Sequence, residues 1–416
     1  MLDLVLRNVR LPDGHVVDLG VQDGRVVHAV GRAAETIDCA GLMVLPGAID
    51  MHAHLRGGVQ AYKEDWDSGT KSALAGGVTV VVDQPNTVPP LETVEAFEAR
   101  VEEGQRRSRC GFGINGAVTP DAELEGLHAA GALAFGEIFA APSSYGEAIS
   151  DATLATALRR IRALDALATF HLEDPMPGIP KTLEEHDRLR PAAGEDRALN
   201  RVLSLAPPGL RFHCCHLTSP SAVRCARSAG ATVEVTPHHL LLDWEAFASG
   251  DGRARVNPPL RNRGCREALR ACISEIDAVA SDHAPHTVEE KARPFAEAPS
   301  GLPGIETMLP LLLARVLDGA FPLERLIALT STGPARILGI RPAGFVPGDR
   351  ADFSLFRPFA EPVRANRLHS RCGWTPYEGM PAVFPERVVV AGELVYSDER
   401  FASVKGSWVS GNGYMN

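Results

Sequence analysis

The chain has 416 residues, of which 45% are apolar and 23% charged, an ordinary balance for a globular enzyme with one large and one smaller domain. Its net charge of −10, from 52 acidic and 42 basic residues, argues against nucleic acid or an anionic membrane as the main partner. The N-terminus lacks the apolar core of a secretory signal, and no stretch approaches the roughly 18 uninterrupted apolar residues of a membrane span.

The two ends of the chain are similar in pattern. The first forty residues predict short strands, with Asp23-Gly24 as the two-residue turn of a hairpin. Residues 387–396 again place a turn between two apolar runs. Neither end has enough strands for an independent sheet. We therefore expect residues 1–46 and 345–416 to form one small, discontinuous β-sandwich-like domain.

Between the ends, strand-like and helical segments alternate, which is typical of βα units with a parallel sheet. Eight repeats favour an α/β fold of the TIM-like (β/α)8 barrel type over residues 47–344, with an open doubly wound sheet as the alternative. No Gly-x-Gly-x-x-Gly or Walker sequence follows a strand, so no nucleotide cofactor is indicated. The expected strands are 43–49, 78–83, 112–118, 133–139, 167–171, 210–216, 232–236 and 278–281, and the clearest helices are 66–75, 93–103, 152–166, 220–229 and 264–275.

A His-x-His pair follows the first of these runs. Side chains alternate along a strand, so His52 and His54 project to one face, where a single metal ion can take both imidazoles. Arg56 follows directly and would set a fixed positive charge beside the metal.

Further candidate ligands recur at the ends of later strands, which meet at one face of a barrel. Each histidine alone could be a hydrogen-bonded core residue, but a carboxylate in the apolar segment around Glu137 needs a cation or a donor. Together with the first pair, these side chains can hold two divalent metals, one carboxylate bridging them, and activate a water molecule. The additional ligands are Glu137, His171, His216 and Asp282.

Seven motifs, in order, closely resemble those of dihydroorotases of the amidohydrolase superfamily, and the resemblance runs almost from end to end. They are Asp50-x-His52-x-His54-Leu55-Arg56, Tyr62-Lys63-Glu64-Asp65, Asp83-Gln84-Pro85-Asn86-Thr87, Thr236-Pro237-His238-His239-Leu240, Val256-Asn257-Pro258-Pro259-Leu260-Arg261, Ser281-Asp282-His283-Ala284-Pro285-His286 and Gly304-Ile305-Glu306-Thr307.

The resemblance implies a role for each matching residue. His52, His54 and Asp282 would hold one metal, and His171 and His216 the other. Arg56, Asn86 and His286 would grip the substrate carboxylate, and Asn257 would contact the pyrimidine ring. The alternative is a surface salt bridge for Arg56 and a turn residue for Asn86. We expect His238 and His239 to serve helix capping or packing, not metal binding.

The chain departs from the family pattern at two places. Many relatives carry a carboxylated lysine where this chain has Glu137, so either one or two ions, zinc above all, can be expected. Relatives usually show Arg-Asp-Pro-Gly where this chain has Arg56-Gly57-Gly58-Val59. Residues 301–304 are either a substrate-covering loop or a plain surface connection.

The resemblance implies reversible interconversion of L-dihydroorotate and N-carbamoyl-L-aspartate in pyrimidine biosynthesis, with Asp282 acting first as base and then as acid. The alternatives are an allantoinase or hydantoinase and a catalytically silent homologue that scaffolds aspartate transcarbamoylase. A homodimer and association with aspartate transcarbamoylase are possible arrangements. The eight cysteines form no Cys-x-x-Cys pair, so we expect a reduced, cytoplasmic protein.

Overall fold

A barrel of eight parallel strands forms the larger part of the structure, a computed structural model that describes residues 1–140 and 149–414. Three strands form one sheet and five another, and single bridges between Gly116 and Phe135 and between Ala53 and His283 close the ring. The strands are β6 (Ala48–Ala53), β7 (Val78–Asp83), β8 (Gly111–Ile114), β9 (Phe135–Phe139), β10 (Leu167–His171), β11 (Arg211–Cys214), β12 (Thr232–Val235) and β13 (Ala278–Val279).

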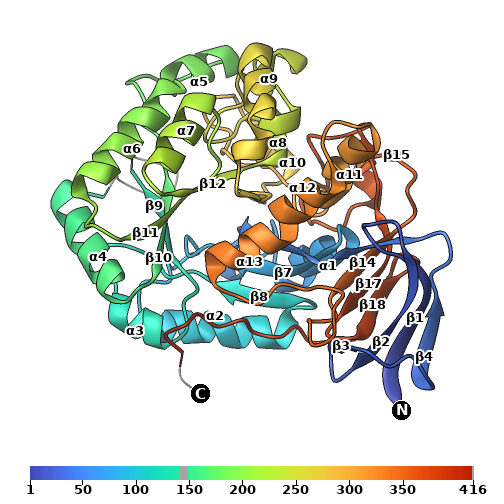
Figure 1. Cartoon of the computed structure of the whole chain (residues 1–416). Coiled ribbons are helices and arrows are strands. Elements are labelled where there is room, and N and C mark those ends of the chain that lie inside the picture. The colour runs from blue at the N-terminus through green and yellow to red at the C-terminus, as the bar shows by residue number, and fades with distance from the viewer. Residues whose placement is uncertain (141–148, 415–416) are drawn as a thin grey trace.

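Helices pack around the outside of the barrel strands, as Figure 1 shows for α3 to α7. Their sequences explain where they begin and which face they bury. Ser219 accepts a hydrogen bond from the Ala222 amide and so caps α7, and α2 buries Phe97 and Val101 one turn apart. The helices are α1 (Trp66–Ala75), α2 (Val94–Arg107), α3 (Leu124–Ala129), α4 (Asp151–Ala163), α5 (Leu183–Leu189), α6 (Ala193–Leu205), α7 (Pro220–Ser228), α8 (Pro237–Leu241), α9 (Arg263–Ala271), α10 (Val288–Lys291), α11 (Met308–Leu317), α12 (Leu323–Ile327) and α13 (Gly333–Leu338).

The two chain ends share one nine-stranded sheet, which confirms the predicted discontinuous β domain. Its blue and red strands lie side by side at the lower right of Figure 1. Both predicted hairpins are present, and positive φ angles at Asp23, Gly24, Ala391 and Gly392 make their two-residue turns. The sheet contains β1 (Leu2–Arg10), β2 (Val16–Gln22), β3 (Arg25–Val27), β4 (Ala33–Asp38), β5 (Met43–Pro46), β14 (Phe353–Phe356), β17 (Pro385–Val390), β18 (Glu393–Ser397) and β19 (Arg400–Phe401), and a separate pair is β15 (Glu361–Pro362) with β16 (Pro381–Ala382).

The apolar run 43–49 is divided between the two parts of the fold. β5 pairs with β14 of the nine-stranded sheet, whereas β6 pairs with β7 of the barrel. Between them, the Gly47 amide donates to the Asp352 carbonyl (2.9 Å), and a Cβ at Gly47 would lie 2.1 Å from Thr79 Oγ1. The prediction of one strand over 43–49 is therefore wrong, because apolar residues report burial and not the sheet in which they are buried.

The last part of the chain returns from the β domain to the barrel. The Phe112 amide of β8 donates to the Ser407 carbonyl (2.9 Å), and the Val409 amide donates to the Phe112 carbonyl (2.7 Å). The eight cysteines, all in the described part of the chain, form no disulfide. No helix among the described residues combines the length and the apolar character needed to cross a bilayer.

Candidate metal centre and its adjoining cavity

His52 and His54 lie at the C-terminal end of β6, whose six residues are all buried. His52 donates through Nδ1 to Glu234 Oε1 (3.1 Å), which leaves Nε2 as the nitrogen that can bind a metal. His54 Nε2 lies 3.1 Å from Asp282 Oδ1, and His52 Nε2 lies 3.6 Å from the same oxygen. One ligand atom from each of these three residues thus falls within 4.8 Å of the others, a separation that suits a shared ion.

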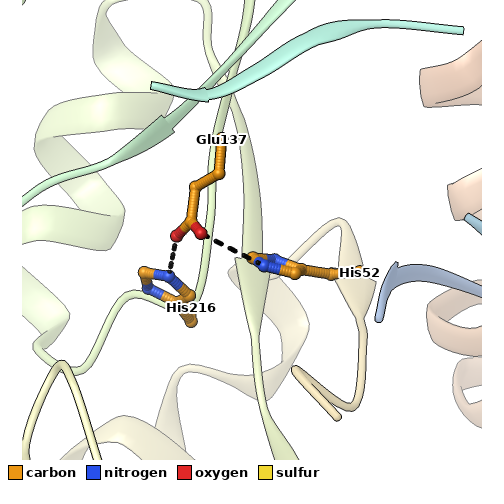
Figure 2. A group of neighbouring side chains, drawn as sticks. All are labelled: His52, Glu137 and His216. Carbon is orange, nitrogen blue, oxygen red and sulfur yellow. Dashed lines mark hydrogen bonds and ion pairs between the residues drawn. The ribbon is translucent and has the colours of Figure 1, made fainter. Parts of the chain in front are cut away.

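Glu137 of β9 lies between the other imidazoles. Its Oε1 is 2.5 Å from His216 Nε2 and 2.9 Å from His171 Nδ1, and its Oε2 is 3.5 Å from His52 Nε2. Figure 2 shows the carboxylate between His52 and His216. Burial alone would raise the pKa of Glu137, but the surrounding imidazoles hold that pKa well below its ordinary value. An ionised carboxylate between histidines from different strands is what a bridging ligand requires.

The donor set fits divalent metal. His52 Nε2 is buried and has no hydrogen-bond partner among the described residues, yet it lies between the carboxylates of Glu137 and Asp282. Such a nitrogen costs free energy unless something binds it. Four imidazoles and two carboxylates provide the ligand types that zinc, manganese or cobalt accept. All six ligands expected from the sequence therefore meet at one place.

Two buried carboxylates that the sequence analysis did not identify accept hydrogen bonds from candidate metal ligands, namely from His52 and His171. Glu234 accepts from His52, as described above, and Glu173 accepts from His171 Nε2 at 2.6 Å. Burial would raise the pKa of Glu173, but Arg190 and His171 lower it to about 2, so its carboxylate can accept this proton. Carboxylates of this kind fix the tautomer and the ring orientation of a metal-binding histidine. The one sequence feature that could have indicated this contact is the position of Glu173, two residues after His171.

Asp282 is held at the end of β13 by a network around the neighbouring residues. The Ser281 amide donates to Asp50 Oδ1 (3.0 Å), and the His54 amide donates to the His283 carbonyl (2.8 Å), which ties this strand end to β6. Burial would raise the pKa of Asp282, but its contact with His54 and the nearby imidazoles lower it. The carboxylate is therefore ionised at neutral pH.

Two adjoining spaces connect the metal ligands with the expected substrate residues. A cavity of about 560 Å³ is lined by Arg56, Asn86 and His286, together with Glu137 and Phe139. A narrow pocket, also lined by Phe139, contains Asn257 and five of the six candidate ligands, namely His54, Glu137, His171, His216 and Asp282. Arg56 is buried, which does not match the alternative of a surface salt bridge, and Asn86 Nδ2 is also buried.

The segment after Arg56 explains why the chain departs from the family pattern there. Gly57 and Gly58 both have positive φ angles, and a Cβ at Gly57 would lie 2.7 Å from Arg100 Nη1. Arg100 is itself fixed by an ion pair with Asp83 (2.7 Å) at the end of β7. Glycine at position 57 thus leaves room for the Arg100 guanidinium beside this backbone.

His238 and His239 lie in α8, next to the site. The Thr236 hydroxyl caps the helix, His239 Nδ1 lies 2.8 Å from that hydroxyl, and His239 Nε2 donates to the Pro258 carbonyl (3.1 Å). His238 is buried, and neither of its ring nitrogens has a hydrogen-bond partner among the described residues. Neither histidine belongs to the groups of ligand atoms described above.

Of residues 301–304, Gly301 lines the narrow pocket. The Gly301 carbonyl accepts a hydrogen bond from Lys291 Nζ (3.0 Å), the Ala284 amide donates to the Leu302 carbonyl (2.9 Å), and the Gly304 amide donates to His283 Nδ1 (3.1 Å). These bonds attach the segment to the end of β13 beside Asp282.

Comparison with known proteins places this geometry in a family. The family model described as "Amidohydrolase family" matches residues 43–395. A dihydroorotase of Methanosarcina acetivorans is 36% identical over 99% of this chain and 96% of its own length, and a dihydroorotase of Halobacterium salinarum is 38% identical over 97% and 98%. The solved structure of an L-hydantoinase (dihydropyrimidinase) from Arthrobacter aurescens aligns with a TM-score of 0.90 at 26% identity, over 99% of this chain and 100% of that one. The chain therefore belongs to the amidohydrolase family.

Proposed function

We propose that this protein is a metal-dependent dihydroorotase that interconverts L-dihydroorotate and N-carbamoyl-L-aspartate. One observation carries the proposal: Glu137 and Phe139 line both the pocket of the metal ligands and the cavity of Arg56 and Asn86. A ring amide at the metal centre would thus have its carboxylate beside a guanidinium, which binds carboxylates through two hydrogen bonds. The dihydroorotase relatives at 36–38% identity support the same substrate.

Each candidate residue has a role in this proposal. His52, His54 and Asp282 would hold one ion, His171 and His216 a second, and Glu137 would bridge them. When bound, divalent ions supply Lewis-acid polarisation and an activated water. We propose zinc because the site is rich in imidazole.

The side chains around the substrate perform the remaining steps. Asp282 would take a proton from the attacking water and deliver it to the leaving ring nitrogen. Arg56 and Asn86, with His286 beside them, would hold the carboxylate, and Asn257 would contact the ring. Residues 47–344 would form the catalytic unit, in a cytoplasmic protein of the pyrimidine pathway. That the protein forms a homodimer, and that it associates with aspartate transcarbamoylase, remain predictions from the sequence.

Two competing functions make different predictions. Allantoinases and hydantoinases act on rings without this carboxylate, whereas a buried guanidinium in the cavity, that of Arg56, is suited to bind one. A silent scaffolding homologue would not need its metal ligands, whereas all six meet here. These observations favour dihydroorotase over both.

A substrate panel tests the proposal. We expect purified, metal-loaded protein to hydrolyse L-dihydroorotate at mildly alkaline pH and to cyclise N-carbamoyl-L-aspartate near neutral pH. Activity with allantoin and dihydrouracil should be far lower, and chelation should abolish turnover until metal is restored. Preference for allantoin or dihydrouracil would contradict the proposal, and bound metal without turnover of any of these compounds would indicate the silent homologue.

A further inference from the structure

A second side-chain cation lines the cavity that contains Arg56. Lys63 belongs to the Tyr62-Lys63-Glu64-Asp65 motif, and its side chain is only 9% exposed to solvent. Burial of an ammonium group costs free energy unless polar partners replace the lost water. The polar contacts of the Lys63 ammonium group therefore indicate its role.

Lys63 Nζ has two polar contacts among the described residues. It lies 3.0 Å from Glu290 Oε1 and 3.2 Å from His286 Nδ1. An ammonium group carries three N–H donors, so one donor remains without a partner among these residues, in a side chain that lines the cavity. Glu290 also accepts from Tyr62 Oη (2.9 Å) and from the Thr287 amide (3.1 Å), so this carboxylate does not serve Lys63 alone.

Both ring nitrogens of His286 are engaged by protein groups. Its Nε2 donates to the Ser300 carbonyl (3.1 Å), which leaves Nδ1 as the acceptor that faces Lys63 Nζ. Burial lowers the pKa of His286 to about 3, with the charges of Arg56 and Lys63 adding to the effect and Glu290 opposing it. The imidazole is thus neutral at neutral pH and is a weaker partner for an anion than an ammonium group.

We propose that Lys63 is a substrate-binding residue whose remaining N–H donates to the same carboxylate that Arg56 and Asn86 bind. His286 is then a positioning residue, because it joins Lys63 to the Ser300 carbonyl and acts on the substrate through Lys63. This inference rests on the proposed function, and it changes the role that the family resemblance implies for His286.

Steady-state kinetics of Lys63 variants test the proposal, with L-dihydroorotate and with dihydrouracil, which lacks the carboxylate. Loss of one charge-assisted hydrogen bond should raise KM for L-dihydroorotate about tenfold or more in Lys63→Met, with little change in kcat. The value of kcat/KM for dihydrouracil should change less than about twofold, because the lost contact is specific to the carboxylate. Lys63→Arg should restore part of the affinity.

Lys71 offers a matched control. It is a partly exposed lysine of α1 that pairs with Asp67 (2.7 Å), and Lys71→Met should behave like wild type with both substrates. An unchanged KM for L-dihydroorotate in Lys63→Met would overturn the inference. An equal loss of kcat/KM with both substrates would also overturn it, because such a loss marks a merely structural role. If wild-type protein does not turn over L-dihydroorotate at all, the proposed function fails and this inference fails with it.

A double-mutant cycle separates the two roles of His286. If His286 acts through Lys63, His286→Phe should raise KM in the wild-type background but add little in the Lys63→Met background. If the increases in KM of the two single variants instead multiply in the double variant, His286 binds the carboxylate itself. Metal content and thermal unfolding of every variant confirm that the site is intact.

Discussion

Asn86 joins the candidate metal centre to the cavity of Arg56 through its contact with His54. The carbonyl Oδ1 of Asn86 lies 2.8 Å from His54 Nδ1, so His54 donates there and turns Nε2 towards Asp282. The amide Nδ2 of Asn86 is buried and has no hydrogen-bond partner among the described residues, in a side chain that lines the cavity of Arg56. One amide thus orients a candidate metal ligand with its oxygen and offers a donor with its nitrogen.

Two substitutions of Asn86 should separate these tasks. Asn86→Asp keeps an acceptor for His54 but places a negative charge where the substrate carboxylate binds, so KM for L-dihydroorotate should rise about tenfold or more while metal content stays normal. Asn86→Leu removes both functions, and metal affinity should also fall by about tenfold or more. Elemental analysis and chelator competition report the metal, and steady-state assays report KM. Normal KM in Asn86→Asp would contradict a carboxylate-binding role.

Asp282→Asn should remove the group that we propose transfers the proton. An amide can neither accept a proton from water nor deliver one to the leaving nitrogen, so kcat should fall by about 10²-fold or more. Asp282 is buried against His54, but asparagine has nearly the same shape, so the thermal unfolding midpoint should change little. Retained turnover would exclude the acid–base role.

Glu137→Gln tests the bridge between the two proposed ions. Glutamine lacks the negative charge that would attract an ion on each side, so bound metal per chain should fall by about one ion, and activity should fall with it. Glu98→Gln, at an exposed position of α2, is the matched control. Unchanged stoichiometry and activity in Glu137→Gln would rule out bridging.

The sequence predicted those features that depend on local pattern. The apolar runs 78–83 and 167–171 match β7 and β10 to the residue, because both strands are buried on both faces and each begins just after a turn. His52 and His54 could be assigned to one metal because alternation along a strand places both on the same face. The strand ends then indicated which distant residues meet, since the parallel strands of a barrel share one catalytic face.

The partners of these residues could not be predicted in the same way. Glu234 is 182 residues from His52, and a buried glutamate in a short strand has no sequence signature for the histidine it holds. The Lys63 contact with His286 spans 223 residues. Such pairs depend on how side chains from separate loops converge, which apolar periodicity does not record.

His186 should make the protein sensitive to acid for a reason unrelated to catalysis. It is buried, and its Nε2 donates to the Val256 carbonyl (3.0 Å). Burial, aided by the charge of Arg190, lowers its pKa from 6.5 to about 4. Above pH 6.5 the imidazole is neutral in both the folded and the unfolded chain, so it has no effect on the pH dependence there. Between pH 6.5 and about 4 the unfolded chain binds a proton that the folded chain does not, and the free energy of unfolding falls.

His186→Gln should reduce this acid sensitivity, because a neutral amide can donate to the Val256 carbonyl but does not titrate. The difference between variant and wild type should change with pH by on the order of 3 kcal/mol between pH 7 and pH 4. Denaturant unfolding at matched metal concentration measures it, and His28→Gln, at an exposed position, is the control. Parallel pH profiles for His186→Gln and wild type would show that His186 accepts its proton in the folded protein, which this buried environment should prevent.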